Sequence, residues 1–244
     1  MRSTGVSSNT APTARTWMER GTALFLQALA GLDNDDMDAD TALPGWTRRH
    51  IVAHVASNAE ALQRLATWAR TGEPTPMYAS REQRDADIER GARLGVADLR
   101  RWAVTSAQRL NADLDSLSPE AWRAEVVTIQ GRTVPCTELP WLRSRETGVH
   151  AVDLAAGVEF ADLPHDFCLA LIDDVVRHRS ALASGPAVRL YATDTERTWT
   201  VGGADTATEV RATAADLARW LVGRGEDGVR VDHGDRLPVL PRWL

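Results

Sequence analysis

The chain has 244 residues, of which 43% are hydrophobic and 25% charged, enough for one large domain or two small ones. Its net charge of -6 offers no basic surface, so we expect neither nucleic acid nor an anionic membrane as a partner. All 28 basic residues are arginine, which excludes Schiff-base chemistry on a lysine. The two cysteines, Cys136 and Cys168, are too few for a disulfide framework and indicate the reducing cytoplasm.

The N-terminal residues 1–13 are polar and lack the apolar core of a signal peptide, so we expect a disordered tail. The longest apolar stretch, residues 21–32, is much shorter than a bilayer requires. The sequence therefore predicts no membrane span.

Amphipathic helical patterns dominate the chain up to about residue 160. Thr47 follows the turn Leu43-Pro44-Gly45-Trp46 and is a good N-cap for a helix. Around Gln130-Gly131-Arg132 the hydrophobic period shortens to two, which predicts short extended pieces. The predicted helices cover residues 14–32, 48–71, 80–91 and 95–117, and a further helix starts near residue 137. Together they predict a helix bundle, a fold that builds metal sites between facing helices.

Beyond Gly157 the chain alternates helical and extended patterns. We predict helices at residues 164–182 and 214–222, extended runs at 188–192, 198–201 and 209–212, and a short strand at 229–231. The sequence thus predicts a mainly α protein with a bundle over residues 14–160 and a small α+β domain over residues 161–244.

A carboxylate and an imidazole lie four residues apart in the last helix of the bundle. Glu146 and His150 share one face of this helix, so both can contact one ion. Such pairs are also common on helix surfaces, and a catalytic zinc usually has three protein ligands. The chain therefore needs a third ligand from another helix.

His54 is the candidate for that third ligand, because it lies beside the apolar face of the predicted helix 48–71. A core histidine bonded to a neighbouring carbonyl is the alternative. His50 lies four residues earlier, but the run Arg48-Arg49-His50 has the character of an exposed helix start. We expect His50 to face solvent.

Several short blocks are distributed in order along nearly the whole chain. They are Gly45-Trp46-Thr47-Arg48 with His54-Val55-Ala56, Thr75-Pro76-Met77-Tyr78, Gly131-Arg132-Thr133-Val134-Pro135, Arg143-Ser144-Arg145-Glu146 with His150-Ala151-Val152-Asp153-Leu154, Gly223-Arg224-Gly225, and Pro241-Arg242-Trp243-Leu244. In this order the blocks resemble the mycothiol-dependent maleylpyruvate isomerase family.

The resemblance implies a DinB-like four-helix bundle that holds a divalent metal, usually zinc, followed by a small α/β domain. It places the family's metal ligands on His54, Glu146 and His150 and its functional arginine on Arg224. Without the resemblance, Arg224 is better explained as a cation that opposes the dipole of the preceding helix. The family's cofactor is mycothiol, a thiol that actinobacteria make.

The activity that the resemblance implies is the cis–trans isomerisation of maleylpyruvate to fumarylpyruvate. Family relatives also include S-transferases that act on bulkier electrophiles such as antibiotic intermediates, and this is our second hypothesis. A non-catalytic metal-binding or sensing protein is the third. The expected partners are a small-molecule electrophile and mycothiol, in a monomer or small homo-oligomer. The sequence leaves open the electrophile and the choice among zinc, nickel, cobalt and iron.

Four further residues have roles that the sequence must weigh. The family usually has a bulky aromatic residue where this chain has Gly148, and one hypothesis is that the glycine enlarges the substrate pocket. Asp153 could accept a hydrogen bond from a ligand imidazole or lie on the helix surface. Cys136 precedes a helix, where a thiol can be activated, but packing as a small residue explains it better. Cys168 lies in an apolar helical run and is expected in the core.

Overall fold

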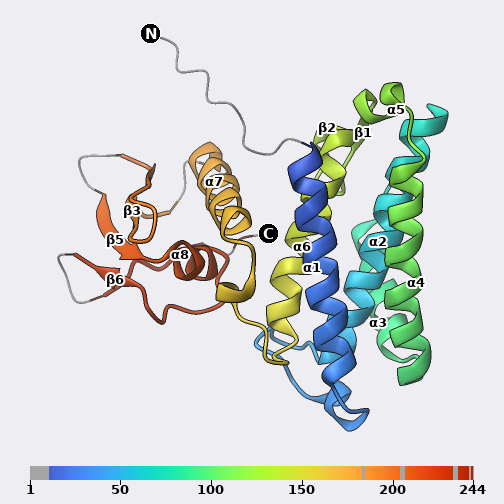
Figure 1. Cartoon of the computed structure of the whole chain (residues 1–244), viewed down its shortest axis with the longest axis horizontal. Helices are drawn as coiled ribbons and strands as arrows, with labels where there is room; N and C mark the ends of the chain where they lie inside the picture. Colours follow the sequence, from blue (N-terminus) through green and yellow to red (C-terminus); the bar gives the residue numbers. More distant parts are fainter. Residues whose placement is uncertain (1–10, 183–184, 204–206, 233–235, 242, 244) are drawn as a thin grey trace. The chain divides into compact units, whose positions relative to one another are not determined.

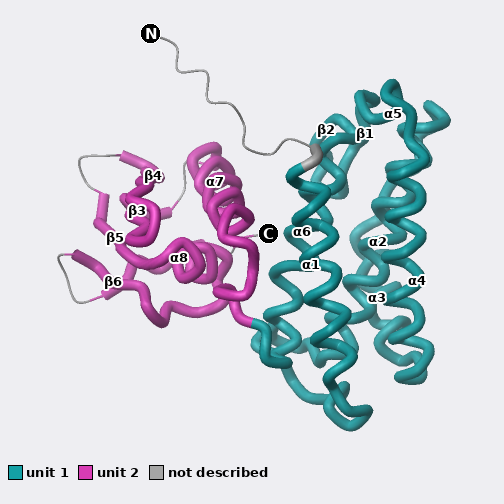
Figure 2. The backbone as a smooth tube through the Cα atoms, in the orientation of Figure 1, with its two compact units in different colours: residues 1–158 teal, residues 159–244 magenta. Residues whose placement is uncertain are grey.

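The protein is described here from a computed structural model, for residues 11–182, 185–203, 207–232, 236–241 and 243. The chain divides into two compact units, residues 1–158 and 159–244 (Figure 2). This division falls close to the boundary predicted near residue 160. Most of the predicted tail, residues 1–10, lies outside the described residues, and the first helix begins at Ala11, earlier than predicted.

The first unit is a bundle in which α1 packs along α6, and α2 packs against α3, α4 and α6 (Figure 1). Its helices are α1 (Ala11–Gly31), α2 (Arg48–Thr71), α3 (Arg81–Ala92), α4 (Val96–Asp115), α5 (Pro119–Arg123) and α6 (Leu139–Asp153). The strands β1 (Glu125–Val127) and β2 (Thr133–Pro135) form the antiparallel pair expected around the turn at Gly131. Three short 3-10 helices are η1 (Asp35–Asp38), η2 (Cys136–Glu138) and, in the second unit, η3 (Phe160–Asp162). The mainly helical fold predicted from the periodicity is confirmed.

Helix α5 was not predicted. Ser118 begins it, because its hydroxyl accepts a hydrogen bond from the backbone N–H of Ala121 at 3.2 Å. Pro119 follows at the first helical turn, where its missing N–H is not needed. A helix of five residues is too short to show a clear hydrophobic period.

Helix α2 contributes many buried side chains to the bundle. Its buried aliphatic residues include Ile51, Val55 and Leu62, which are fully or almost fully covered. Polar His54 and Asn58 are buried on the same helix. Because a buried polar group costs free energy unless it is hydrogen-bonded, these two side chains require partners from neighbouring helices.

Small residues allow α1 and α6 to approach closely. A Cβ atom added at Gly21 of α1 would lie 2.6 Å from Thr147 Oγ1 and 3.2 Å from the backbone nitrogen of Gly148. At about 100° per residue, position 148 points about 200° away from Glu146 around α6. The helix contact accounts for Gly21, and position 148 lies away from the face of α6 that carries Glu146, which does not favour the hypothesis that Gly148 enlarges a substrate pocket there.

The second unit combines two helices with a four-stranded mixed sheet. Its elements are α7 (His165–Leu182), β3 (Val188–Ala192), β4 (Thr198–Val201), β5 (Thr208–Ala212), α8 (Ala214–Leu221) and β6 (Arg230–Val231). The strand order is β4-β3-β5-β6, with β3 and β5 parallel and the outer pairs antiparallel. Buried Arg179 of α7 donates to the carbonyls of Leu221 and Pro241 at 3.0 and 2.8 Å, and so joins α7 to the end of α8 and to the C-terminal segment.

None of the helices formed by the described residues has the length and apolar character of a membrane span.

Candidate metal centre

Three side chains that the sequence suggested as ligands converge between α2 and α6. His54 Nε2 lies 2.8 Å from Glu146 Oε2, and His150 Nε2 lies 3.5 Å from the same oxygen. One potential ligand atom from each residue falls within 4.8 Å of the others. Both imidazoles are buried, while the Glu146 side chain is 27% exposed. The three groups therefore face one small volume that is reachable from solvent on the carboxylate side.

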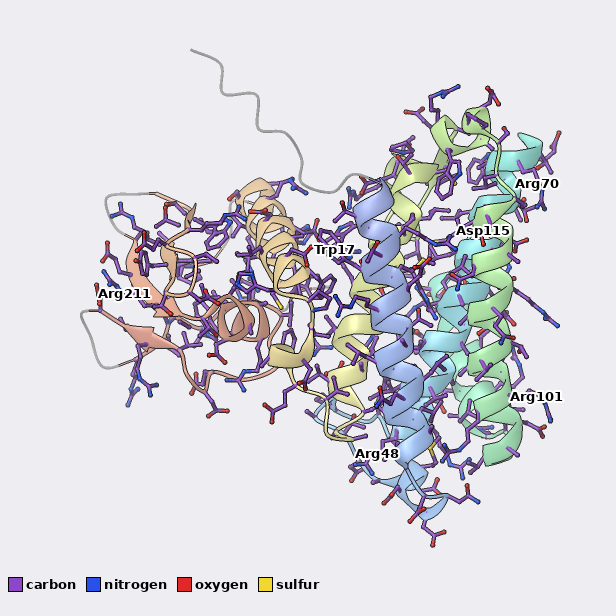
Figure 3. The ribbon with its side chains drawn as sticks, in the orientation of Figure 1. Trp17, Arg48, Arg70, Arg101, Asp115 and Arg211 are labelled. Carbon is purple, nitrogen blue, oxygen red and sulfur yellow. The ribbon has the colours of Figure 1, made fainter. Side chains whose placement is uncertain are left out.

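Arg48 joins the two helices that carry the ligands. It lies at the start of α2, and its guanidinium donates to the carbonyls of Leu154 and Ala155 at 2.7 and 3.0 Å, just past the end of α6 (Figure 3). These carbonyls have no partner within their own helix, so the arginine satisfies them and fixes the helix ends together.

His50 does not join the ligand group. Its Nδ1 accepts a hydrogen bond from the backbone N–H of Thr47 at 3.1 Å and so helps to cap α2. Its Nε2 lies 3.4 Å from Glu89 Oε1. The prediction that His50 faces solvent was wrong, since only 16% of its side chain is exposed. The hydrogen bond from Thr47 holds the ring against the start of the helix.

Asp153 orients the imidazole of His150. Its Oδ2 lies 2.8 Å from His150 Nδ1, and the Asp153 side chain is only 2% exposed. The carboxylate accepts the Nδ1–H, so Nε2 is the ring nitrogen that faces Glu146. Of the two roles considered for Asp153, the structure therefore shows the one that supports a metal ligand.

His54 has a different pair of partners. Burial lowers the pKa of His54 to about 4, although the hydrogen bond that its ring donates to Glu146 acts in the opposite direction, so the ring is neutral at pH 7. Its Nδ1 lies 3.3 Å from Arg84 Nη2 on α3. Arg84 was not recognised in the sequence, because nothing in its local pattern distinguishes it from the other arginines of a polar helix.

Glu146 stays ionised in this buried setting. Burial raises its pKa, but hydrogen bonds from His150 and His54 outweigh burial and hold the pKa well below the usual range. One turn earlier, the fully buried Arg143 donates to the Val55 carbonyl at 2.7 Å and to Asn58 Oδ1 at 2.9 Å. Burial lowers the pKa of Arg143 to about 10, so it is still a cation at neutral pH and favours the nearby carboxylate.

The indole of Trp46 lies against both ligand imidazoles. Its ring centroid is 5.4 Å from that of His54 and 6.5 Å from that of His150, where the rings are nearly parallel. The turn holds Trp46 in place, because its carbonyl accepts hydrogen bonds from the N–H and hydroxyl of Thr41. In the sequence Trp46 belongs to a predicted turn and to the family resemblance, and neither predicted its contact with the candidate ligands.

The donor set fits a divalent metal ion. Two imidazole nitrogens and one carboxylate oxygen are the ligands of an open catalytic zinc site, and Asp153 supplies the outer hydrogen bond that such a histidine usually has. Three protein ligands leave one position for water, a thiol or a substrate.

Comparison with known proteins identifies the family. The sequence model of the mycothiol maleylpyruvate isomerase N-terminal domain matches residues 18–155, and that of the MDMPI C-terminal domain matches residues 162–242. The chain belongs to this family. No curated protein matches it significantly.

Solved structures agree with this family assignment. The crystal structure of the mycothiol-dependent maleylpyruvate isomerase is 36% identical, with a TM-score of 0.92 over 96% of this chain and 97% of that one. A histidine-to-alanine mutant of that isomerase matches with a TM-score of 0.91, at the same identity and coverage. YfiT from Bacillus subtilis, described as a probable metal-dependent hydrolase with a four-helix bundle, is 16% identical, with a TM-score of 0.50 over 64% of this chain and 91% of that one. This last likeness shows the fold of the DinB-like bundle alone.

The family's expected arginine, Arg224, belongs to the second unit. It follows α8 between two glycines with positive φ, Gly223 and Gly225, and its Nη1 donates to the Val222 carbonyl at 2.8 Å. The side chain is only partly covered. Its functional role stays a prediction.

Neither cysteine provides a protein nucleophile. Cys136 is fully buried and Cys168 is 1% exposed, and both thiols are free. Burial raises the pKa of each thiol to about 12, so neither is a thiolate at neutral pH. Both act as small core residues, as expected.

Proposed function

We propose that this protein is a metal- and mycothiol-dependent enzyme that isomerises maleylpyruvate to fumarylpyruvate. The observation that carries the proposal is the preformed group of His54, Glu146 and His150, within a chain similar over 96% of its length to the mycothiol-dependent maleylpyruvate isomerase. The neutral imidazole of His54 and the ionised carboxylate of Glu146 are the protonation states that metal ligands need.

The three ligands would hold zinc, to which two imidazoles and one carboxylate are well suited. When bound, the ion lowers the pKa of a coordinated thiol, so that the sulfur is a thiolate at neutral pH. Trp46 would help to shield the reaction from water, because its ring lies against both imidazoles.

Mycothiol would supply the nucleophile, a thiol whose reversible addition to the cis double bond of maleylpyruvate would allow rotation about that bond without net consumption of thiol. We propose that Arg224 binds a substrate carboxylate through its two parallel N–H groups and stabilises the enolate charge.

We also propose that the enzyme works in the cytoplasm, where a free thiol cofactor stays reduced. The S-transferase hypothesis loses sequence support, since position 148 points about 200° away from Glu146 around α6. The likeness to an isomerase favours the first hypothesis.

The test is to incubate zinc-loaded protein with mycothiol and maleylpyruvate and to follow both compounds by mass spectrometry. We expect fumarylpyruvate to accumulate while the mycothiol concentration stays constant. The variant Arg224→Lys tests the role of Arg224. It keeps the charge and loses the paired N–H groups, and we expect it to lower kcat. Stoichiometric loss of mycothiol would instead indicate an S-transferase, and absence of turnover with bound zinc would refute the proposal.

A further inference from the structure

The end of α8 has the hydrogen bonds of a Schellman motif, in which N–H groups beyond a helix donate back to its last turn. The backbone N–H of Gly223 donates to the Trp220 carbonyl at 3.0 Å. That of Arg224 donates to the Arg219 carbonyl, also at 3.0 Å. Gly223 has a φ of +75°, the left-handed conformation that the motif requires. Arg219 and Arg224 therefore occupy the two positions that often make a hydrophobic contact across such a turn.

Two cations at these positions would repel each other, and acidic and carbonyl partners balance the charge of Arg219. Its Nη2 donates to Asp216 Oδ1 at 3.2 Å, one turn earlier on α8, and to the backbone carbonyl of Asp227 across the loop. Its Nη1 lies 3.8 Å from the Asp227 carboxylate. The Arg219 side chain is only 23% exposed, so these contacts are partly shielded from water. Arg219 thus joins the helix to the far side of the loop.

The carboxylate of Asp216 is itself held in place. Its Oδ2 accepts a hydrogen bond from the Thr213 hydroxyl at 2.8 Å, and the backbone N–H of Asp216 donates to that hydroxyl oxygen at 3.2 Å. A Cβ atom added at Gly228 would lie 2.7 Å from Asp216 Oδ2. The loop backbone therefore packs directly on the carboxylate that pairs with Arg219.

The loop that carries Arg224, residues 222–229, is fixed at both ends and in its middle. Val222 and Val229 are 1% and 3% exposed and anchor its ends in the core. Between them the backbone folds around Arg219, whose Cδ and Nε would lie 3.9 Å from a Cβ atom at Gly225. Arg224 Nη1 donates to the Val222 carbonyl at 2.8 Å, so the loop backbone also directs the Arg224 guanidinium. The orientation of Arg224 therefore depends on the shape that Arg219 gives to the loop.

We propose that Arg219 is a positioning residue for Arg224. Through Asp216 and the Asp227 carbonyl it holds the loop in the conformation that directs the Arg224 guanidinium at a substrate carboxylate. This role rests on the proposed function, in which Arg224 binds that carboxylate. Two parallel hydrogen bonds between a guanidinium and a carboxylate require a defined direction, and a loop that is already ordered loses less entropy when the substrate binds.

The first experiment measures hydrogen exchange of the loop by mass spectrometry. Arg219→Met keeps the apolar part of the side chain and removes the donors, so we expect amides of residues 222–229 to exchange about tenfold faster, the effect of one lost hydrogen bond to a charged group. Arg177→Met is the matched control, because Arg177 also pairs with an aspartate three residues earlier, Asp174, at 3.4 Å on α7. It should leave the exchange of the loop unchanged. Unchanged exchange in Arg219→Met would refute the role of Arg219 in holding the loop.

The second experiment measures maleate binding to zinc-loaded protein by calorimetry, as a double-mutant cycle with Arg224→Ala. Maleate is a cis dicarboxylate, and without a thiol it does not react. We expect Arg219→Met to weaken maleate binding about tenfold when Arg224 is present, and by less than about twofold in the Arg224→Ala background. Arg219→Lys keeps a charged donor and should give an intermediate loss. A merely structural arginine would cause the same loss in both backgrounds.

Each result decides a separate question. Equal losses in the two backgrounds, or maleate binding that Arg219→Met leaves unchanged, would refute the positioning role. A wild-type protein that binds no maleate, or binds it equally well after Arg224→Ala, would overturn the carboxylate contact of Arg224 and with it this role of Arg219. If maleylpyruvate is not isomerised while maleate binding follows the expected cycle, the proposed function fails and the assignment of Arg219 stands.

Discussion

Replacing Asp153 by alanine tests whether the metal centre is preorganised. The change removes the acceptor 2.8 Å from His150 Nδ1, in a place where only 2% of the Asp153 side chain is exposed. When Nε2 binds a metal ion, the proton must be on Nδ1, so the variant leaves a buried donor without a partner. In the metal-free protein the ring can change tautomer and avoid much of this loss. The lost hydrogen-bond free energy therefore destabilises mainly the metal-bound state.

The expected magnitude follows from the charge on the acceptor. A hydrogen bond to a charged group contributes about 1.5–3 kcal/mol, which corresponds to a loss of about 10- to 100-fold in zinc affinity. Asp153→Asn keeps an uncharged acceptor of the same shape and should lie between the wild type and Asp153→Ala.

Competition with a chromophoric chelator measures these affinities, and circular dichroism verifies the fold. Asp115→Ala is a suitable control, because Asp115 is 71% exposed in its ion pair with Arg15 and should not affect zinc. If folded Asp153→Ala bound zinc within about twofold of the wild type, the reasoning on the outer hydrogen bond would be refuted.

Four further predictions follow from the ligands, the helix contact and the cysteines. His54→Ala should abolish stoichiometric zinc binding measured by elemental analysis, and retained zinc would mean that the wrong ligand was chosen. Gly21→Ala should lower the free energy of unfolding by about 1–3 kcal/mol despite better helix propensity, because its Cβ would lie 2.6 Å from Thr147 Oγ1; equal or higher stability in thermal unfolding would contradict the close α1–α6 contact. Because burial raises the thiol pKa of both Cys136 and Cys168 to about 12, native protein should react with a thiol reagent at pH 8 far more slowly than unfolded protein. Cys136→Ser should keep full isomerase activity, and loss of activity with an intact fold would point to a protein nucleophile.

The sequence by itself determined most of the elements. Helix α2 spans Arg48–Thr71 as predicted, and β3 and β4 coincide with the predicted runs 188–192 and 198–201. These features are local, since a hydrophobic period and a capping residue act within a few turns. The pair Glu146 and His150 is local for the same reason, because residues four apart on a helix share a face.

The tertiary structure alone decided how distant groups combine at the site. His54 and Glu146 are 92 residues apart and meet at 2.8 Å only because α2 packs against α6. The contacts of Trp46 and Arg84 with His54 have no local signature, since they depend on a turn and a helix that pack beside α2. The sequence thus supplied the candidate metal ligands, while packing decided which neighbours contact them.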